Sequence, residues 1–278
     1  MERIGFMQGR LSPLVDGRIQ AFPWSSWEQE FALAERNGLR LMEWTLDQDR
    51  LYDNPLLTRP GQARIRQLCE RHRVAIPSLT GDCFMQAPFW KAHGGERARL
   101  QQDFRAIADA CVQVGVAMIV VPLVDNGRLE GVEQRETLVA FLEGEAAALH
   151  ERNLRVIFEC DYAPAELARF IGQLDPAVFG VNYDIGNSAA LGFDPAAELA
   201  SYGHRVVNVH VKDRVLGGTT VALGIGNADF EAVFSGLAGC GYRGNYILQT
   251  ARADDGNHAQ ALVRYRDMTL DWLRAHGA

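Results

Sequence analysis

Short apolar runs alternate with longer amphipathic stretches along the whole chain. The apolar runs are rich in Val, Ile, Leu and Phe, which is typical of parallel strands buried on both faces. They predict eight strands, at 4–8, 39–45, 74–79, 117–122, 154–160, 178–184, 206–214 and 245–250. The stretches that follow them repeat apolar residues every three or four positions and predict helices, at 26–38, 60–71, 100–114, 132–152, 164–174, 195–202, 230–237 and 262–274.

This alternation predicts an α/β fold, a single (β/α)8 barrel of the TIM type that spans residues 1–278 as one domain. No linker rich in Pro, Gly or Ser divides the pattern. The alternative is a doubly wound open sheet, which would carry a phosphate-binding GxGxxG fingerprint after its first strand. Gly5 and Gly9 do not form that fingerprint, so we favour the barrel.

Composition and charge narrow the class of protein. No apolar run approaches the ~20 residues of a membrane span, and the first residues show no secretory signal, so a cytoplasmic protein without a membrane partner is expected. Five scattered cysteines without a CxxC pair favour reduced thiols over disulfides or a zinc–thiolate site. The formal net charge of −7 disfavours nucleic acid as a partner.

Polar groups at the ends of the last four predicted strands carry the candidate chemistry. Strands five to eight end in turn with Glu159, Asp184, His210 and Gln249. Because the carboxyl ends of the strands form the active-site face of such barrels, these side chains are expected to meet. Oxygen ligands with one imidazole suit a divalent ion such as Mn²⁺, Mg²⁺ or Co²⁺, with Zn²⁺ as a further candidate.

Each of these residues also has a purely structural interpretation. Asp184 can cap the helix that follows it, and His210 can be a core histidine whose nitrogens are satisfied by neighbours. The presence of Glu159, Asp184 and His210 on successive strand ends is what favours one shared site.

The chain resembles the xylose isomerase-like barrel superfamily of sugar and sugar-phosphate isomerases and epimerases over essentially its whole length. The resemblance rests on IFE at 157–159, DIGN at 184–187, HVKD at 210–213 and GIGNADF at 224–230. It implies a divalent metal held by Glu159, Asp184, His210 and the residue that ends strand eight. It also implies that a carboxylate close to the metal removes a proton next to a carbonyl.

Two positions depart from the pattern of that superfamily. Gln249 stands where a second glutamate is usual, and an amide can ligate a cation but cannot act as a base. Asn187 stands where some epimerases carry a histidine. Glu159 is then the one base linked to the metal, which fits a one-base proton shuttle, a lyase-type elimination, or a relative that has lost activity.

Further polar residues near the strand ends are candidates for contacts with a substrate. Gln8, Glu43 and Asn187 could contact sugar hydroxyls. Arg10, Arg214 and Arg252 could bind a phosphate or carboxylate, or form ion pairs at the surface or the strand ends. Lys212 is a candidate catalytic residue that stabilises an enediolate, or it forms a salt bridge to Asp213 or to a neighbouring strand. Trp44, Phe84, Phe89 and Trp90 are expected to wall the pocket or to pack against a partner subunit, and the segment 80–95 is a candidate lid.

We therefore predict an enzyme, a metal-dependent isomerase or epimerase whose small-molecule partner is a sugar or sugar phosphate. A keto-sugar or keto-cyclitol dehydratase of the same superfamily is the first alternative, and a non-catalytic sugar-binding relative is another because of Gln249. A DNA-repair endonuclease of this fold would need more histidines at strand ends and a basic face. Barrels of this kind often pair, so the resemblance is compatible with a homo-oligomer.

Overall fold

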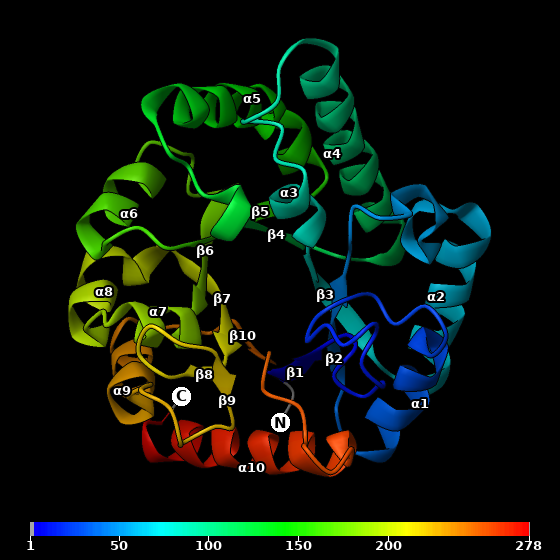
Figure 1. The fold of residues 1–278 in the computed structure, drawn as a ribbon, viewed down its shortest axis with the longest axis vertical. Coiled ribbons are helices and arrows are strands. Elements are labelled where there is room, and N and C mark those ends of the chain that lie inside the picture. Colours follow the sequence, from blue (N-terminus) through cyan, green and yellow to red (C-terminus); the bar gives the residue numbers. More distant parts are fainter. Residues whose placement is uncertain (1–2, 278) are drawn as a thin grey trace.

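The computed structural model describes residues 3–277 and contains a closed barrel of eight parallel strands surrounded by helices (Figure 1). The barrel strands are β1 (Ile4–Met7), β2 (Leu41–Thr45), β3 (Ala75–Thr80), β4 (Met118–Leu123), β5 (Arg155–Cys160), β6 (Phe179–Asp184), β7 (Val206–Val211) and β10 (Asn245–Leu248). They follow one another around the barrel in chain order, and β1 pairs with both β2 and β10. The predicted (β/α)8 barrel is confirmed.

Ten helices cover the outside of the barrel or follow its strand ends in the described part of the chain. They are α1 (Trp27–Arg36), α2 (Arg59–His72), α3 (Asp82–Gln86), α4 (Gly94–Val114), α5 (Val132–Glu151), α6 (Pro164–Ile171), α7 (Ile185–Leu191), α8 (Pro195–Tyr202), α9 (Phe230–Gly239) and α10 (His258–Ala275). The sequence pattern did not predict α3 and α7, because helices this short show no clear apolar period. Within residues 3–277, no helix is both long and apolar enough to span a membrane.

Short elements fill the connections. They are the 3-10 turns η1 (Leu51–Asp53), η2 (Pro55–Leu57), η3 (Asp125–Gly127) and η4 (Gly203–Arg205), and the strands β8 (Asp213–Arg214) and β9 (Thr220–Val221). The strands β8 and β9 pair antiparallel with each other, outside the barrel. This small hairpin directly follows β7, so it fixes the path of the chain at the end of the strand that carries His210.

Local sequence sets several of the helix ends. The Oγ1 atom of Thr58 accepts a hydrogen bond from Gly61 N at 3.1 Å and so caps α2. The helix α4 ends where Gly115 adopts a left-handed conformation with φ of +82°. Ser26 precedes α1 without a side-chain cap hydrogen bond, and its Oγ atom instead donates to Ser12 Oγ at 2.9 Å.

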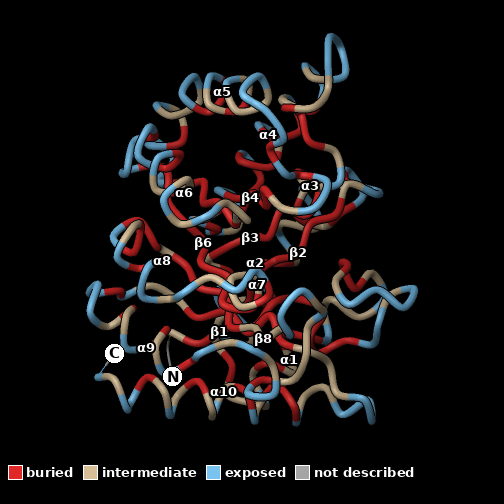
Figure 2. Tube along the Cα trace, turned by 60° about the vertical axis from the view of Figure 1, so that its left-hand side comes forward, coloured by how far each residue is buried: buried red, intermediate tan, exposed pale blue. Residues whose placement is uncertain are grey.

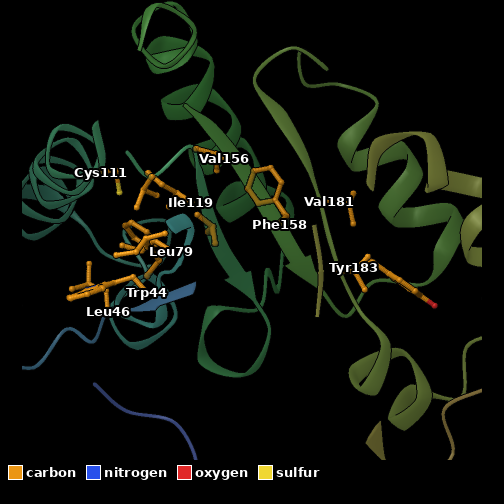
Figure 3. Close-up of a cluster of buried hydrophobic side chains, with 14 of the residues drawn as sticks. Trp44, Leu46, Leu79, Cys111, Ile119, Val156, Phe158, Val181 and Tyr183 are labelled. Atoms are coloured by element: carbon orange, nitrogen blue, oxygen red, sulfur yellow. The ribbon is translucent and has the colours of Figure 1, made fainter. Parts of the chain in front are cut away.

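The hydrophobic core lies between the barrel and its helices. Buried residues follow the strands and the inner faces of the helices, whereas exposed residues lie on outer helix faces and loops (Figure 2). In this layer Phe158 on β5 belongs to a cluster of buried apolar side chains (Figure 3). The centre of its ring lies 5.2 Å from that of Phe170 on α6. Burial of one such ring contributes about 1.5–3 kcal/mol, so this layer supports the strands from outside and leaves their C-terminal ends free for polar groups.

The connection between β1 and α1 is tied to the end of β10. The guanidinium of Arg10 donates from Nε to Thr250 O and from Nη1 to Ile19 O, at 2.9 Å in both cases. The buried carboxylate of Glu30 accepts hydrogen bonds from Gly9 N at 3.0 and 2.9 Å. These contacts hold the connection over the carboxyl ends of the strands, where the candidate site lies.

Candidate active site

A cavity of about 450 Å³ opens at the carboxyl ends of the barrel strands. Glu159 of β5 and Thr80 of β3 line it from the barrel, and Lys212 and Gln249 line it from just after β7 and β10. Ile19 and Gln20 line it from the β1–α1 connection, and Asn187, Arg128 and Arg214 contribute further polar groups. The cavity therefore lies on the face that the barrel rule predicts for an active site.

The structure brings Glu159, Asp184 and His210 together, as the sequence predicted. Each offers one ligand atom, and these atoms all lie within 4.8 Å of one another. All three residues are buried, with exposed fractions of 7%, 4% and 0%. Asp184 also caps α7, since its Oδ1 atom accepts a hydrogen bond from Asn187 N at 2.8 Å. The structural and the metal-binding interpretation of Asp184 are thus compatible, because its two oxygens face different partners.

His210 is held between two carboxylates. Its Nε2 atom lies 2.6 Å from Glu43 Oε1, and its Nδ1 atom lies 3.1 Å from Glu159 Oε2. Burial would lower the pKa of His210, but the negative charges of Glu43 and Glu159 raise it to about 10. A carboxylate on the outer nitrogen is the usual partner of a metal-bound histidine, because it fixes the orientation of the ring.

Glu43 was expected to contact a sugar, but the structure places it beneath the cavity. It has no exposed surface, and it accepts hydrogen bonds from Ser78 Oγ at 2.6 Å, from Thr80 Oγ1 and from Asn208 Nδ2 at 3.1 Å. We therefore correct its predicted place: Glu43 supports His210 from behind and does not line the cavity.

Lys212 joins the polar groups along the wall of the cavity. Its Nζ atom donates to Asp184 Oδ2 at 3.1 Å, and to Asn187 Oδ1 and Gln249 Oε1 at 3.2 Å in both cases. Of the two structural partners expected for Lys212, the structure has the neighbouring strand and not Asp213, because its carboxylate partner is Asp184 at the end of β6. Gln249 likewise directs its oxygen to an ammonium group, so its predicted role as a metal ligand stays a prediction.

Asp213 explains why the HVKD motif is followed by a glycine-rich loop. Its Oδ2 atom accepts hydrogen bonds from Gly224 N at 2.8 Å and Gly226 N at 2.9 Å, and its Oδ1 atom accepts one from Ala228 N at 3.1 Å. A Cβ atom at Gly226 would lie 2.1 Å from Asp213 Oδ1 and 2.7 Å from Arg214 O. The two motifs therefore form one clamp that fixes the chain just after β7.

Asn187 and Arg214 line the cavity, as expected for residues that contact a substrate. Asn187 Nδ2 donates to Glu159 Oε1 at 2.6 Å, and Arg214 Nη1 donates to Asn187 Oδ1 at 2.8 Å. The pKa of Glu159 is lowered, because the positive charges of His210 and Lys212 outweigh the effect of burial. Glu159 thus stays ionised with one oxygen towards His210 and the other towards Asn187.

Three other predicted substrate contacts lie away from the cavity. Arg10 is buried and binds backbone carbonyls, and Arg252 donates to Ser12 O and to Ile19 O. Gln8 is fully buried, and its Oε1 atom accepts a hydrogen bond from Thr45 N at 3.1 Å. These side chains organise the β1–α1 connection and the contact between β1 and β2. We therefore correct their predicted place: they do not line the cavity.

The aromatic residues expected to wall the pocket belong instead to the core. Trp44 is fully buried and donates from Nε1 to Asn54 Oδ1 at 3.2 Å. Phe89 packs against Phe141 of α5 at 4.7 Å, and Trp90 Nε1 donates to Gly127 O at 3.0 Å. Phe84 packs on Phe104 of α4 at 5.5 Å. The segment 80–95 is therefore anchored by buried side chains, and its predicted role as a lid stays a prediction.

Sequence reasoning missed Asp82, which lines the same cavity. It begins α3 two positions after the end of β3, and 7% of its surface is exposed. Burial and the charges of Asp47 and Glu159 raise its pKa to about 7. The signal was present in the sequence, since an aspartate follows Thr80 and Gly81 just after a strand end.

Comparison with known proteins identifies the family of the chain. A family model described as "Xylose isomerase-like TIM barrel" matches residues 31–276. The chain belongs to the xylose isomerase-like TIM barrel family. The predicted family is confirmed.

A curated relative in this family has a named activity. The L-ribulose-5-phosphate 3-epimerase UlaE of Salmonella paratyphi C (strain RKS4594) is 38% identical over 267 residues, which cover 91% of this chain and 90% of the relative. Such relatives confirm that this xylose isomerase-like barrel is an enzyme of the isomerase class.

Solved structures share the fold of this xylose isomerase-like barrel. The xylose isomerase domain protein from Planctomyces limnophilus matches with a TM-score of 0.77 at 16% identity, over 99% of this chain and 98% of that chain. The IolI protein, solved with a bound zinc atom, matches with a TM-score of 0.77 at 15% identity, over 99% of both chains. At these identities the likeness shows the fold alone.

Proposed function

We propose that the chain is a metal-dependent epimerase or isomerase of a sugar or sugar phosphate that removes a proton next to the substrate carbonyl. The meeting of Glu159, Asp184 and His210 carries this proposal, together with the cavity of about 450 Å³ that Glu159 lines. A cavity of this size is in the range of small-molecule sites. The named activity of the UlaE relative, epimerisation of L-ribulose 5-phosphate at carbon 3, supports the same class of substrate.

The donor set fits a divalent cation. Two carboxylates and one imidazole approach one another closely and are buried, which is the chemistry of a mixed oxygen and nitrogen metal site. Glu159, Asp184 and His210 would hold the cation, and Gln249 would add an amide oxygen once that oxygen leaves Lys212. When bound, the cation would polarise the substrate carbonyl and lower the cost of removing the neighbouring proton.

Different residues of the chain would then transfer the proton, stabilise the developing charge and position the substrate. Glu159 is the ionised carboxylate that takes the proton from the carbon next to the carbonyl. Lys212 brings a positive charge near the oxygen on which negative charge develops in the enediolate. Asn187 and Arg214 face the cavity and hold sugar hydroxyls in place.

Replacement of Glu159 by Gln tests the proposal. The amide cannot accept the proton, so exchange of the carbon-bound proton should fall by at least a factor of ~100. We would measure deuterium uptake from D2O by NMR with L-ribulose, L-ribulose 5-phosphate and other ketoses. The matched control is Glu133→Gln, which removes an exposed carboxylate on α5. Full exchange activity in Glu159→Gln would refute the assignment.

A dehydratase is the second candidate, and Gln249 favours it. An elimination needs one base and a leaving hydroxyl, whereas epimerisation also needs an acid on the other face of the carbon. Gln249 has no proton-transferring group, and its Nε2 atom donates to Gln20 Oε1 at 2.9 Å. Mass spectrometry of the product separates the two, because an elimination loses water and an epimerisation conserves mass.

A further inference from the structure

A second carboxyl group enters the cavity from a different strand. Asp82 follows β3, whereas Glu159 lies on β5, and β4 separates these two strands in the barrel. Both side chains line the same cavity. Within residues 3–277 the Oδ2 atom of Asp82 accepts one hydrogen bond, from Gln20 Nε2 at 2.7 Å, and its Oδ1 atom has no protein partner. One oxygen of Asp82 is thus held and the other is available to a substrate.

The side-chain amide of Gln20 holds Asp82 in this position, and two donors orient that amide. Gln249 Nε2 donates to Gln20 Oε1 at 2.9 Å, and Arg10 Nη2 donates to the same oxygen at 3.4 Å. Because both donors occupy the oxygen of Gln20, its Nε2 atom is turned towards Asp82. The chain Gln249–Gln20–Asp82 therefore leads from the end of β10 to the one buried carboxyl group on the β3 side of the cavity.

The other carboxylates of the cavity are less suited to proton transfer. Asp161 is engaged by a guanidinium, since its Oδ2 atom lies 2.5 Å from Arg128 Nη2 in a salt bridge that a substrate would have to break. Asp125 is exposed to solvent at the rim. Asp82 is buried, and a carboxyl group in such a place is readily kept protonated near neutral pH.

We propose that Asp82 is the second proton-transfer residue of this enzyme and serves the face of the sugar carbon that Glu159 does not. The inference rests on the proposed function. Glu159 breaks the carbon–hydrogen bond, and the electron pair of that bond forms the enediolate as the carbonyl π pair moves to oxygen. The enediolate then takes a proton from the carboxyl group of Asp82, which restores the carbonyl and forms the new carbon–hydrogen bond. Exchange of protons with solvent returns Glu159 to the carboxylate and Asp82 to the acid.

This role makes a prediction that a structural role does not. In Asp82→Asn, Glu159 still removes and returns a proton on its own face, so exchange with D2O continues. Formation of the epimer should fall by at least a factor of ~100, because the amide has no proton of suitable acidity. The control is Asp125→Asn, which removes a carboxylate at the rim of the same cavity and should keep both rates.

The experiment follows proton exchange by NMR and epimer formation by chromatography, with L-ribulose 5-phosphate and L-ribulose as probes. Exchange without epimer in Asp82→Asn supports the proposal, and so does recovery of epimer formation in Asp82→Asn/Gln249→Glu, where a carboxyl group returns to the cavity wall. Epimer formation at the wild-type rate in Asp82→Asn overturns it, as does loss of exchange and epimer together at an unchanged melting temperature.

A measurement on the wild-type protein covers the case in which Asp82→Asn does not fold. In a first turnover in D2O, two proton-transfer residues place deuterium on the new face of the carbon in every epimer formed. A single shuttling base would return some of the original hydrogen, and that result overturns the proposal. Wild-type protein that exchanges no carbon-bound proton of any ketose instead refutes the proposed function, and the role of Asp82 is refuted with it.

Discussion

The clamp formed by Asp213 gives a prediction whose magnitude can be worked from the structure. Asp213 has no exposed surface and accepts three backbone hydrogen bonds from the loop 224–228. A hydrogen bond to a charged group contributes about 1.5–3 kcal/mol. Removal of all three in Asp213→Ala should therefore lower the free energy of unfolding by about 4.5–9 kcal/mol, a large part of the total stability of a typical domain.

Asp213→Asn should cost less, about 2 kcal/mol, because one side-chain oxygen remains as an acceptor. Its amide nitrogen would face a backbone N–H that now has no acceptor. Both variants should also lose activity, since Asp213 directly follows Lys212 and fixes the path of the chain beyond His210.

Denaturant unfolding followed by tryptophan fluorescence would measure these changes. The matched control is Asp229→Ala, which removes a single cap hydrogen bond at the start of α9 and should cost about 1 kcal/mol. If Asp213→Ala lost no more stability than this control, the three hydrogen bonds would not be the reason for the aspartate, and the interpretation of the motif would be wrong.

Two further predictions concern the buried charges. Burial raises the pKa of Glu30 from 4.5 to about 7, so its contribution stabilises the fold at low pH and is lost as pH rises from 4.5 to 7. Relative to Glu30→Gln, the unfolding free energy of the wild type should fall by about 3 kcal/mol across that window, and a flat difference in denaturant titrations would contradict it. Lys212→Met should lower kcat by a factor of ~100–1000, as loss of an oxyanion-stabilising group does. Metal content by elemental analysis should not fall, because Asp184 loses a competing cation; an unchanged kcat would exclude the proposed role of Lys212.

The sequence alone predicted the barrel and the three candidate ligands for a simple physical reason. Strands buried on both faces leave continuous apolar runs, and a charged residue at the end of such a run stands out. Glu159, Asp184 and His210 are all of this kind. Their meeting followed from topology, since neighbouring parallel strands end on one face of a barrel.

The same reasoning failed where a polar residue near a strand end serves the fold. Arg10 and Arg252 bind carbonyls of the β1–α1 connection, and Glu43 lies beneath the cavity, and no pattern in the chain distinguishes these positions from true cavity positions. Asp82 was missed for the opposite reason. It lies just beyond its strand, on a helix too short to be predicted, and only the tertiary structure shows that it lines the same cavity as Glu159.

The pairing of β1 with β10 has a consequence for how the molecule matures. Ile4 pairs with Tyr246, so the seam of the barrel joins its first strand to its last. A ribosome-bound chain cannot close this seam until β10 has been synthesised, and contacts of such long sequence separation form slowly. Gln20, which follows β1, and Gln249, which follows β10, both line the candidate cavity and form a hydrogen bond across that same seam. The cavity wall therefore cannot close before β10 has been made, and a chain that ends before β10 would leave the barrel open at this seam.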